Sequence, residues 1–201
     1  MMDRYLLNEG QSKINEDIKI FCNNIGEINK IEDLKIVDKV FYENFISDKT
    51  TPKFSRSVIE IFNSKTFSGC SDIGLMMSSI LREKGIPTVY VETVRIDWLD
   101  AERNNRPEKE LMMGHIFLEI FVNGKWYLYD PMFRLYYDNY DNTNNNYPRN
   151  FYVFAKGLNC NSFGIFNTKD ERRIALERLE DFDVKDYINP NYKEIKIKDL
   201  I

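Results

Sequence analysis

The first part of the chain repeats apolar residues at the spacing of amphipathic helices. Apolar positions recur every three or four residues through 14–25 and again through 34–45, and each stripe predicts a helix that covers a core. Residues 54–67 suit a further short helix. The stripe through 73–81 is the clearest, because its apolar positions lie at i, i+3, i+4, i+7 and i+8. Gly85 and Pro87 follow it and predict its end.

The pattern then changes to that of β-strands. Residues 88–96 are rich in β-branched side chains and predict a strand, and residues 133–137 suit another. The polar stretches 100–110 and 138–150 predict exposed loops, and the tyrosine-rich run that leads into the second of them is assigned to the surface. Residues 169–179 return to helical spacing.

Asn123-Gly124 lies between two apolar runs and predicts a β-hairpin, because this dipeptide favours the positive φ angles of a type I′ turn. A two-residue loop places Phe117 opposite Asp130. His115, the only histidine in the chain, then becomes the diagonal neighbour of Asp130 on the same face. Diagonal positions lie about 7–8 Å apart at Cα, so the turn predicts a His–Asp pair. The same register places Glu119 on this face, where a solvated or paired strand glutamate is expected in preference to one that lines the cleft.

Cys70 stands at the predicted N-terminus of the helix that precedes the strands. A helix N-terminus favours a thiolate, because unpaired N–H groups and the helix dipole stabilise negative charge. Asp72 acts in the opposite direction, since a nearby carboxylate raises a thiol pKa. Taken singly, Cys70, His115 and Asp130 are more often structural residues. Their common arrangement predicts a nucleophile, a proton acceptor and the group that orients it.

An acyl-transfer site also needs donors for the oxyanion. The backbone N–H of Cys70 is one candidate, and the sequence identifies no second donor.

Composition reduces the number of functional classes that fit the chain. The 201 residues suit one domain, and 28 basic against 32 acidic residues argue against nucleic-acid binding. No apolar run reaches the length of a membrane span, and no signal segment is evident, so no membrane partner is expected. The three dispersed cysteines predict a reducing cytoplasmic setting without a disulfide framework, and Cys22 and Cys160 receive no functional role. Zinc is disfavoured because no Cys-x-x-Cys pair is present, and no cofactor is expected.

Two segments resemble the transglutaminase-like superfamily. They are Ser68-Gly69-Cys70-Ser71-Asp72 with the strand at 88–91, and the strands Gly114-His115-Ile116-Phe117 and Tyr129-Asp130-Pro131. The resemblance covers roughly residues 67–137. It implies a papain-like α+β core in which the nucleophile helix packs on an antiparallel sheet that carries the histidine and the aspartate. Phe117 stands where the family often has a tryptophan, and the papain signature around the cysteine is absent.

The expected organisation is a single transglutaminase-like domain, with helical N-terminal elaboration at 1–54, a catalytic core at 55–140 and a C-terminal extension at 141–201. The expected function is thiol-dependent attack on an amide bond of a protein or peptide substrate. The acyl-thioester would be resolved by water in preference to an amine, so hydrolysis is favoured over cross-linking. The alternative is a binding or scaffold module that keeps the fold without turnover. It is motivated by the absent tryptophan, the unidentified second oxyanion donor and Asp72.

Overall fold

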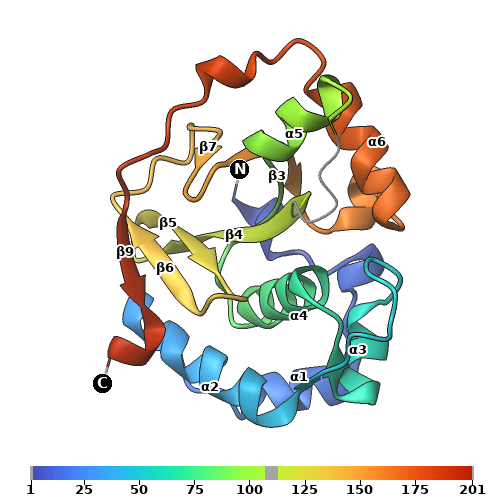
Figure 1. The fold of residues 1–201 in the computed structure, drawn as a ribbon. Helices are drawn as coiled ribbons and strands as arrows, with labels where there is room; N and C mark the ends of the chain where they lie inside the picture. The colour runs from blue at the N-terminus through green and yellow to red at the C-terminus, as the bar shows by residue number, and fades with distance from the viewer. Residues whose placement is uncertain (1, 107–112, 201) are drawn as a thin grey trace.

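The computed structural model describes residues 2–106 and 113–200, and its centre is a seven-stranded sheet with helices packed on it (Figure 1). The strand order is β7-β8-β3-β4-β5-β6-β9, with antiparallel pairing throughout. The strands are β3 (Thr88–Arg95), β4 (Gly114–Val122), β5 (Lys125–Asp130), β6 (Leu135–Asp138), β7 (Asn146–Tyr147), β8 (Phe151–Gly157) and β9 (Lys193–Lys196). The predicted α+β class with an antiparallel sheet is confirmed.

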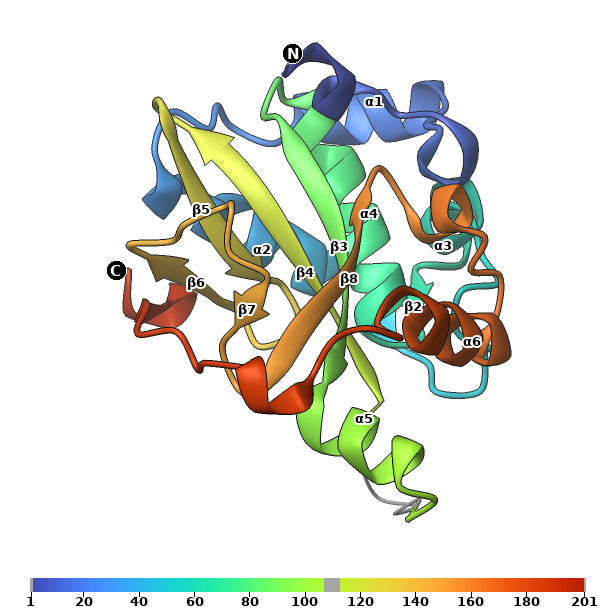
Figure 2. The ribbon, with the colours of Figure 1, turned by 90° about the horizontal axis from the view of Figure 1, so that it is seen from above.

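Helix α4 (Cys70–Glu83) lies at the centre of the helical layer and packs on β3 and β4 (Figure 2). Gly74 permits the close approach, because a Cβ there would lie 2.5 Å from Cγ2 of Ile116 and 3.2 Å from the Tyr90 ring. The other helices are α1 (Glu16–Asn23), α2 (Leu34–Asn44), α3 (Val58–Ser64), α5 (Ile96–Arg103) and α6 (Thr168–Arg178). The predicted helices at the N-terminus, before β3 and near the C-terminus are therefore present.

Shorter elements complete the description. A small parallel sheet pairs β1 (Ile46–Ser47) with β2 (Thr66–Phe67). Short 3-10 turns occupy Asp3–Leu6, Gly10–Ser12, Ile31–Asp33, Cys160–Phe163, Val184–Asp186 and Ile197–Asp199. In the described part of the chain no helix is both long enough and apolar enough to cross a membrane.

The β4–β5 hairpin forms as the turn chemistry predicts. Asn123 and Gly124 have φ angles of 49° and 79°, which are the left-handed values of a type I′ turn. Val122 pairs with Lys125 and Phe121 with Trp126, so the predicted two-residue loop and register are confirmed.

The two faces of the sheet bury different sets of side chains. The α4 face carries Tyr90, Ile116 and Leu118 into the larger core. The opposite face buries a second cluster that includes Phe117 and Phe151. Because neighbouring residues of a strand point to opposite faces, the residues beside Ile116 on β4 face away from α4.

The tyrosine-rich run before residue 141 is buried, and its assignment to the surface is wrong. Tyr136, Tyr137 and Tyr140 are 3%, 2% and 8% exposed. Strand β9 pairs with β6 and covers this region from a distant part of the chain. Glu119 is buried and paired as expected, since it accepts hydrogen bonds from Tyr140, from Tyr147 at 2.7 Å and from Lys156 at 2.6 Å.

Two predicted loops contain regular structure. Helix α5 includes residues 100–103, because Trp98 and Leu99 pack inward and are 8% and 0% exposed. The rest of that predicted loop lies partly outside the described residues. Strand β7 lies within 138–150, where it pairs with β8. Both elements depend on contacts with distant segments, which a local hydropathy pattern does not contain.

Candidate active site

Cys70 occupies the first position of α4, preceded by a glycine whose backbone only glycine adopts readily. Gly69 has a φ of 152°, and its carbonyl accepts the N–H of Ile73 at 3.1 Å to close the first helical turn. The N–H groups of the first turn have no intrahelical partner and point toward the space before the helix. Cys70 is 8% exposed and lines a cavity of about 240 Å³.

His115 and Asp130 meet on the face of the sheet that the hairpin register predicts. Nε2 of His115 lies 2.9 Å from Oδ2 of Asp130, and both side chains are fully buried. Oδ1 of the same carboxylate accepts the backbone N–H of Phe133 at 3.0 Å. Since the carboxylate can only accept, Nε2 carries a proton. Nδ1 has no hydrogen-bond partner among the described residues and is the ring nitrogen left for the Cys70 thiol.

Electrostatics favour the charged form of the imidazole. Burial lowers the pKa of His115, but the charge and hydrogen bond of Asp130, together with the nearby Cys70 thiol, outweigh burial and raise that pKa to about 9. Burial raises the pKa of Asp130, yet His115 and Arg149 reverse this effect and hold it below its ordinary value. A positively charged imidazole beside Cys70 is the environment that stabilises a thiolate.

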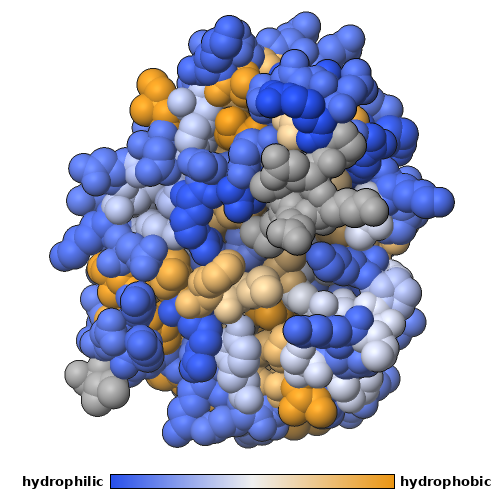
Figure 3. All heavy atoms as spheres, in the orientation of Figure 1, coloured by the Kyte–Doolittle hydropathy of each residue, from blue (hydrophilic) through white to orange (hydrophobic). Residues whose placement is uncertain are grey.

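Aromatic rings fix the plane of the imidazole. The ring centroids of Phe117, Phe151 and Phe133 lie 4.9, 5.3 and 5.5 Å from that of His115. Phe133 is itself 50% exposed, and Met132 beside it is 42% exposed. Figure 3 shows a small apolar patch amid hydrophilic residues near the middle of the face seen in Figure 1. The imidazole is therefore shielded from water by side chains that reach the surface on one side.

Arg149 is a functional candidate that the sequence did not indicate. Its guanidinium forms an ion pair with Oδ2 of Asp130 and lies 4.2 Å from the ring centroid of Phe133. Arg149 and Asn150 both have a φ of 64° in the turn between β7 and β8, and this turn directs the side chain to the aspartate. The sequence around Arg149 does not indicate this role, because the turn reaches the site through the pairing of β8 with β3.

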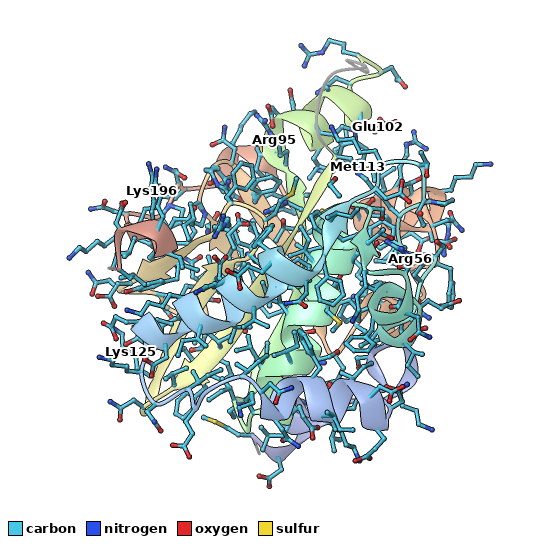
Figure 4. The ribbon with its side chains drawn as sticks, turned by 90° about the horizontal axis from the view of Figure 1, so that it is seen from below. Arg56, Arg95, Glu102, Met113, Lys125 and Lys196 are labelled. Carbon is cyan, nitrogen blue, oxygen red and sulfur yellow. The ribbon has the colours of Figure 1, made fainter. Side chains whose placement is uncertain are left out.

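Asp72, which was expected to disfavour a thiolate at Cys70, has its charge balanced by an ion pair with Arg56. Its buried carboxylate pairs with Arg56 and accepts hydrogen bonds from the backbone N–H and the hydroxyl of Ser68, each at 2.8 Å. Arg56, labelled in Figure 4, also donates a hydrogen bond to the hydroxyl of Thr66 at 2.9 Å. The carboxylate therefore closes the loop before α4 and does not stand as a free charge beside Cys70.

The remaining cysteines, Cys22 and Cys160, lie outside the cavity that Cys70 lines. Burial raises the pKa of Cys22 to about 12, and burial likewise raises that of Cys160, which donates to Gln11 at 2.8 Å. Neither lines the cavity at the start of α4. Across residues 2–106 and 113–200, no three His, Cys, Asp or Glu side chains converge as metal ligands.

A known protein family matches much of the chain. The family model for the transglutaminase-like superfamily matches residues 21–131, more than half of the chain. The protein belongs to the transglutaminase-like superfamily, whose members are usually cysteine-dependent enzymes. No curated protein matches the chain.

A solved structure from Cytophaga hutchinsonii, described as "a putative cysteine protease", has a similar fold. It superposes with a TM-score of 0.52 at 14% sequence identity, over 78% of this chain and 47% of that chain. This chain therefore corresponds to about half of that protein. At this identity the likeness concerns the fold alone.

Proposed function

We propose that the protein is a thiol-dependent hydrolase of amide or peptide bonds, with Cys70 as nucleophile, His115 as general base and acid, and Asp130 as the group that orients His115. The observation that carries the proposal is the order in which Asp130, His115 and Cys70 follow one another in the site. Asp130 holds Nε2 of His115 at 2.9 Å, Nδ1 has no partner among the described residues, and Cys70, which interacts electrostatically with His115, lies at a helix N-terminus.

In the first half of the reaction the Cys70 thiolate attacks the carbonyl carbon, and a C–S bond forms. As the tetrahedral intermediate collapses, the C–N bond breaks and Nδ1–H of His115 gives its proton to the departing amine. In the second half His115 takes a proton from water, which attacks the thioester. The C–S bond then breaks and the product leaves as a carboxylic acid. This restores the Cys70 thiolate beside protonated His115.

Arg149 fits this scheme as a positioning residue. It touches Asp130 and not the reacting atoms, and its charge helps to keep the aspartate ionised. The backbone N–H of Cys70, at the start of α4, is proposed as one donor to the oxyanion. Hydrolysis, and not transfer to an amine, is the reaction proposed; it is consistent with the description of the similar fold from Cytophaga hutchinsonii as "a putative cysteine protease".

Covalent labelling tests the proposal. A peptidyl vinyl sulfone should modify wild-type protein at Cys70 alone, because burial raises the pKa values of Cys22 and Cys160. Cys70→Ala should abolish labelling, and His115→Ala should slow it by about a hundredfold or more. Cys160→Ala serves as the matched control and should label normally. Full labelling of Cys70→Ala would overturn the assignment.

The alternative, a binding or scaffold module without turnover, is supported by one observation. His115 is fully buried and is not part of the wall of the cavity that Cys70 lines. Iodoacetamide reactivity against pH separates the two functions. A module without catalysis predicts a Cys70 that reacts as an ordinary thiol, with a rate that rises near pH 8.5. The hydrolase predicts a thiolate plateau at lower pH that disappears in Asp130→Asn.

A further inference from the structure

The cavity beside Cys70 contains a buried acidic side chain that the proposed reaction does not use. Glu171, from α6, lines the cavity and is 5% exposed. Its carboxylate lies against the backbone of Gly114, so closely that any Cβ at that position would collide with Oε1. Among the described residues the carboxylate has neither a hydrogen-bond donor nor an ion-pair partner. Placing a carboxyl group in so buried a position, with no partner among the described residues, costs stability, and this is the pattern expected of a residue that binds a ligand.

A second acidic group lies behind the first. Glu92 on β3 is fully buried, and neither of its carboxylate oxygens has a hydrogen-bond partner within residues 2–106 and 113–200. Its pKa is raised well above the ordinary value by burial, by Glu171 and by Cys70. Burial also raises the pKa of Glu171, to about 7, against the opposing effect of Lys53. Glu171 is therefore the one acidic side chain among the described residues that line the cavity, and a cation placed beside it would favour its ionised form.

We infer that this cavity is a specificity pocket for a guanidinium or ammonium side chain of the amide substrate, with Glu171 as the residue that recognises the charge. The inference rests on the proposed function, because the pocket matters only if Cys70 attacks a substrate beside it. A volume of about 240 Å³ is smaller than the roughly 300–1,000 Å³ of typical small-molecule sites and suits a single side chain.

The other wall residues fit this occupant. Phe54 and Met113 supply apolar contacts for the methylene stem of a long basic side chain; Met113 lies directly before β4 (Figure 4). Lys53 is the basic residue of the wall, but it is exposed and forms no ion pair with Glu171 in the described structure. We therefore expect Lys53 to weaken the binding of a cation, and its removal to strengthen it.

Binding of two matched ligands tests the pocket without requiring turnover. N-acetylarginine amide and N-acetylcitrulline amide have nearly the same shape and differ in charge. Each would be titrated into nitrogen-15-labelled protein while the amide signal of Gly114 is followed by NMR. We expect the arginine compound to bind at least tenfold more tightly, as for a hydrogen-bonded charge pair. Glu171→Gln should abolish this ratio and Lys53→Met should increase it.

Glu177→Gln is the matched control, because Glu177 lies exposed on the same helix and pairs with Arg173. It should leave the ratio unchanged. Equal affinity of the two ligands for wild-type protein, or a ratio that survives in Glu171→Gln, overturns the inference.

A parallel assay separates failure of the pocket from failure of the proposed function. Peptides with arginine or citrulline on either side of the scissile amide would be incubated with the protein, and the released acid measured by mass spectrometry. Turnover of both peptides without a preference overturns the pocket and leaves the hydrolase standing. Arginine binding that depends on Glu171, without turnover of any peptide, overturns the hydrolase and leaves a cation-binding pocket.

Discussion

Asp130→Asn tests the electrostatic coupling at the centre of the site. The substitution keeps the size of the side chain and removes the negative charge that lies 2.9 Å from Nε2 of His115. Burial then acts without opposition from the carboxylate, so we expect the pKa of His115 to fall from about 9 to 6.5 or below. At about 1.4 kcal/mol for each tenfold change in proton affinity, this corresponds to roughly 3 kcal/mol.

The measurement is unusually direct, because His115 is the only histidine in the chain. Its ring protons can be followed by NMR from pH 5 to pH 10 without assignment of competing signals. Asp141→Asn provides the control, since Asp141 is exposed and hydrogen-bonds only locally to Thr143. The control should leave the titration of His115 unchanged.

The same coupling predicts how stability depends on pH. Since folding raises the pKa of His115, its protonated form stabilises the fold fully below pH 6.5, and this contribution is lost as the pH rises through about 9. Asp130 has a lowered pKa, so its contribution is present above pH 3.8 and is lost as the pH falls through the pKa of the folded protein. The difference in unfolding free energy between wild type and Asp130→Asn should therefore decrease as the pH rises through about 9, because the contribution of protonated His115 is lost there. A wild-type His115 that titrates near 6.5 would refute the reasoning.

Three further substitutions test other parts of the site. Arg149→Met removes the guanidinium beside Asp130, so the pKa of His115 should rise above about 9 in the same NMR titration, and an unchanged value would exclude a role for Arg149. Gly74→Ala places a methyl group 2.5 Å from Ile116 and should lower the free energy of unfolding in urea by about 1–3 kcal/mol. Glu171→Gln removes a carboxyl whose pKa is raised from 4.5 to about 7, so ionisation destabilises the fold as the pH rises through this interval. The variant should therefore gain up to about 3 kcal/mol of stability relative to wild type between pH 4 and pH 8, measured by urea unfolding, and an equal difference at both pH values would contradict this.

The features that could be predicted from the sequence are those that local chemistry specifies. Asn123-Gly124 permits a type I′ turn, and that turn alone fixes which residues of β4 and β5 share a face. The apolar stripe of α4 and the glycine before Cys70 likewise specify a helix and its start within a few residues. Local signals of this kind were sufficient to bring His115 and Asp130 together, because seven residues lie between His115 and the turn and five lie between the turn and Asp130.

The features that escaped prediction depend on contacts between distant segments. Arg149 reaches Asp130 because β8 pairs with β3, and Glu171 reaches the cavity because α6 packs beside the start of β4. Tyr140 is buried through its contacts with Glu119 and with Tyr192 from the C-terminal segment. No periodicity records such pairings, since each segment alone has the composition of a polar loop or an exposed helix.

The position of His115 on the sheet explains why these distant residues gather where they do. Ile116 packs against Gly74 of α4, so alternation along β4 turns His115 to the opposite face, where Phe117 and Phe151 enclose it. Cys70 belongs to the helix on the first face and can approach the imidazole only around the beginning of β4. Gly114 stands at that point without a side chain, and the space is shared by the thiol and the Glu171 carboxylate. A residue with a Cβ at position 114 would collide with Oε1 of Glu171, so the absence of a side chain at Gly114 is what allows the Glu171 carboxylate to line the cavity beside Cys70.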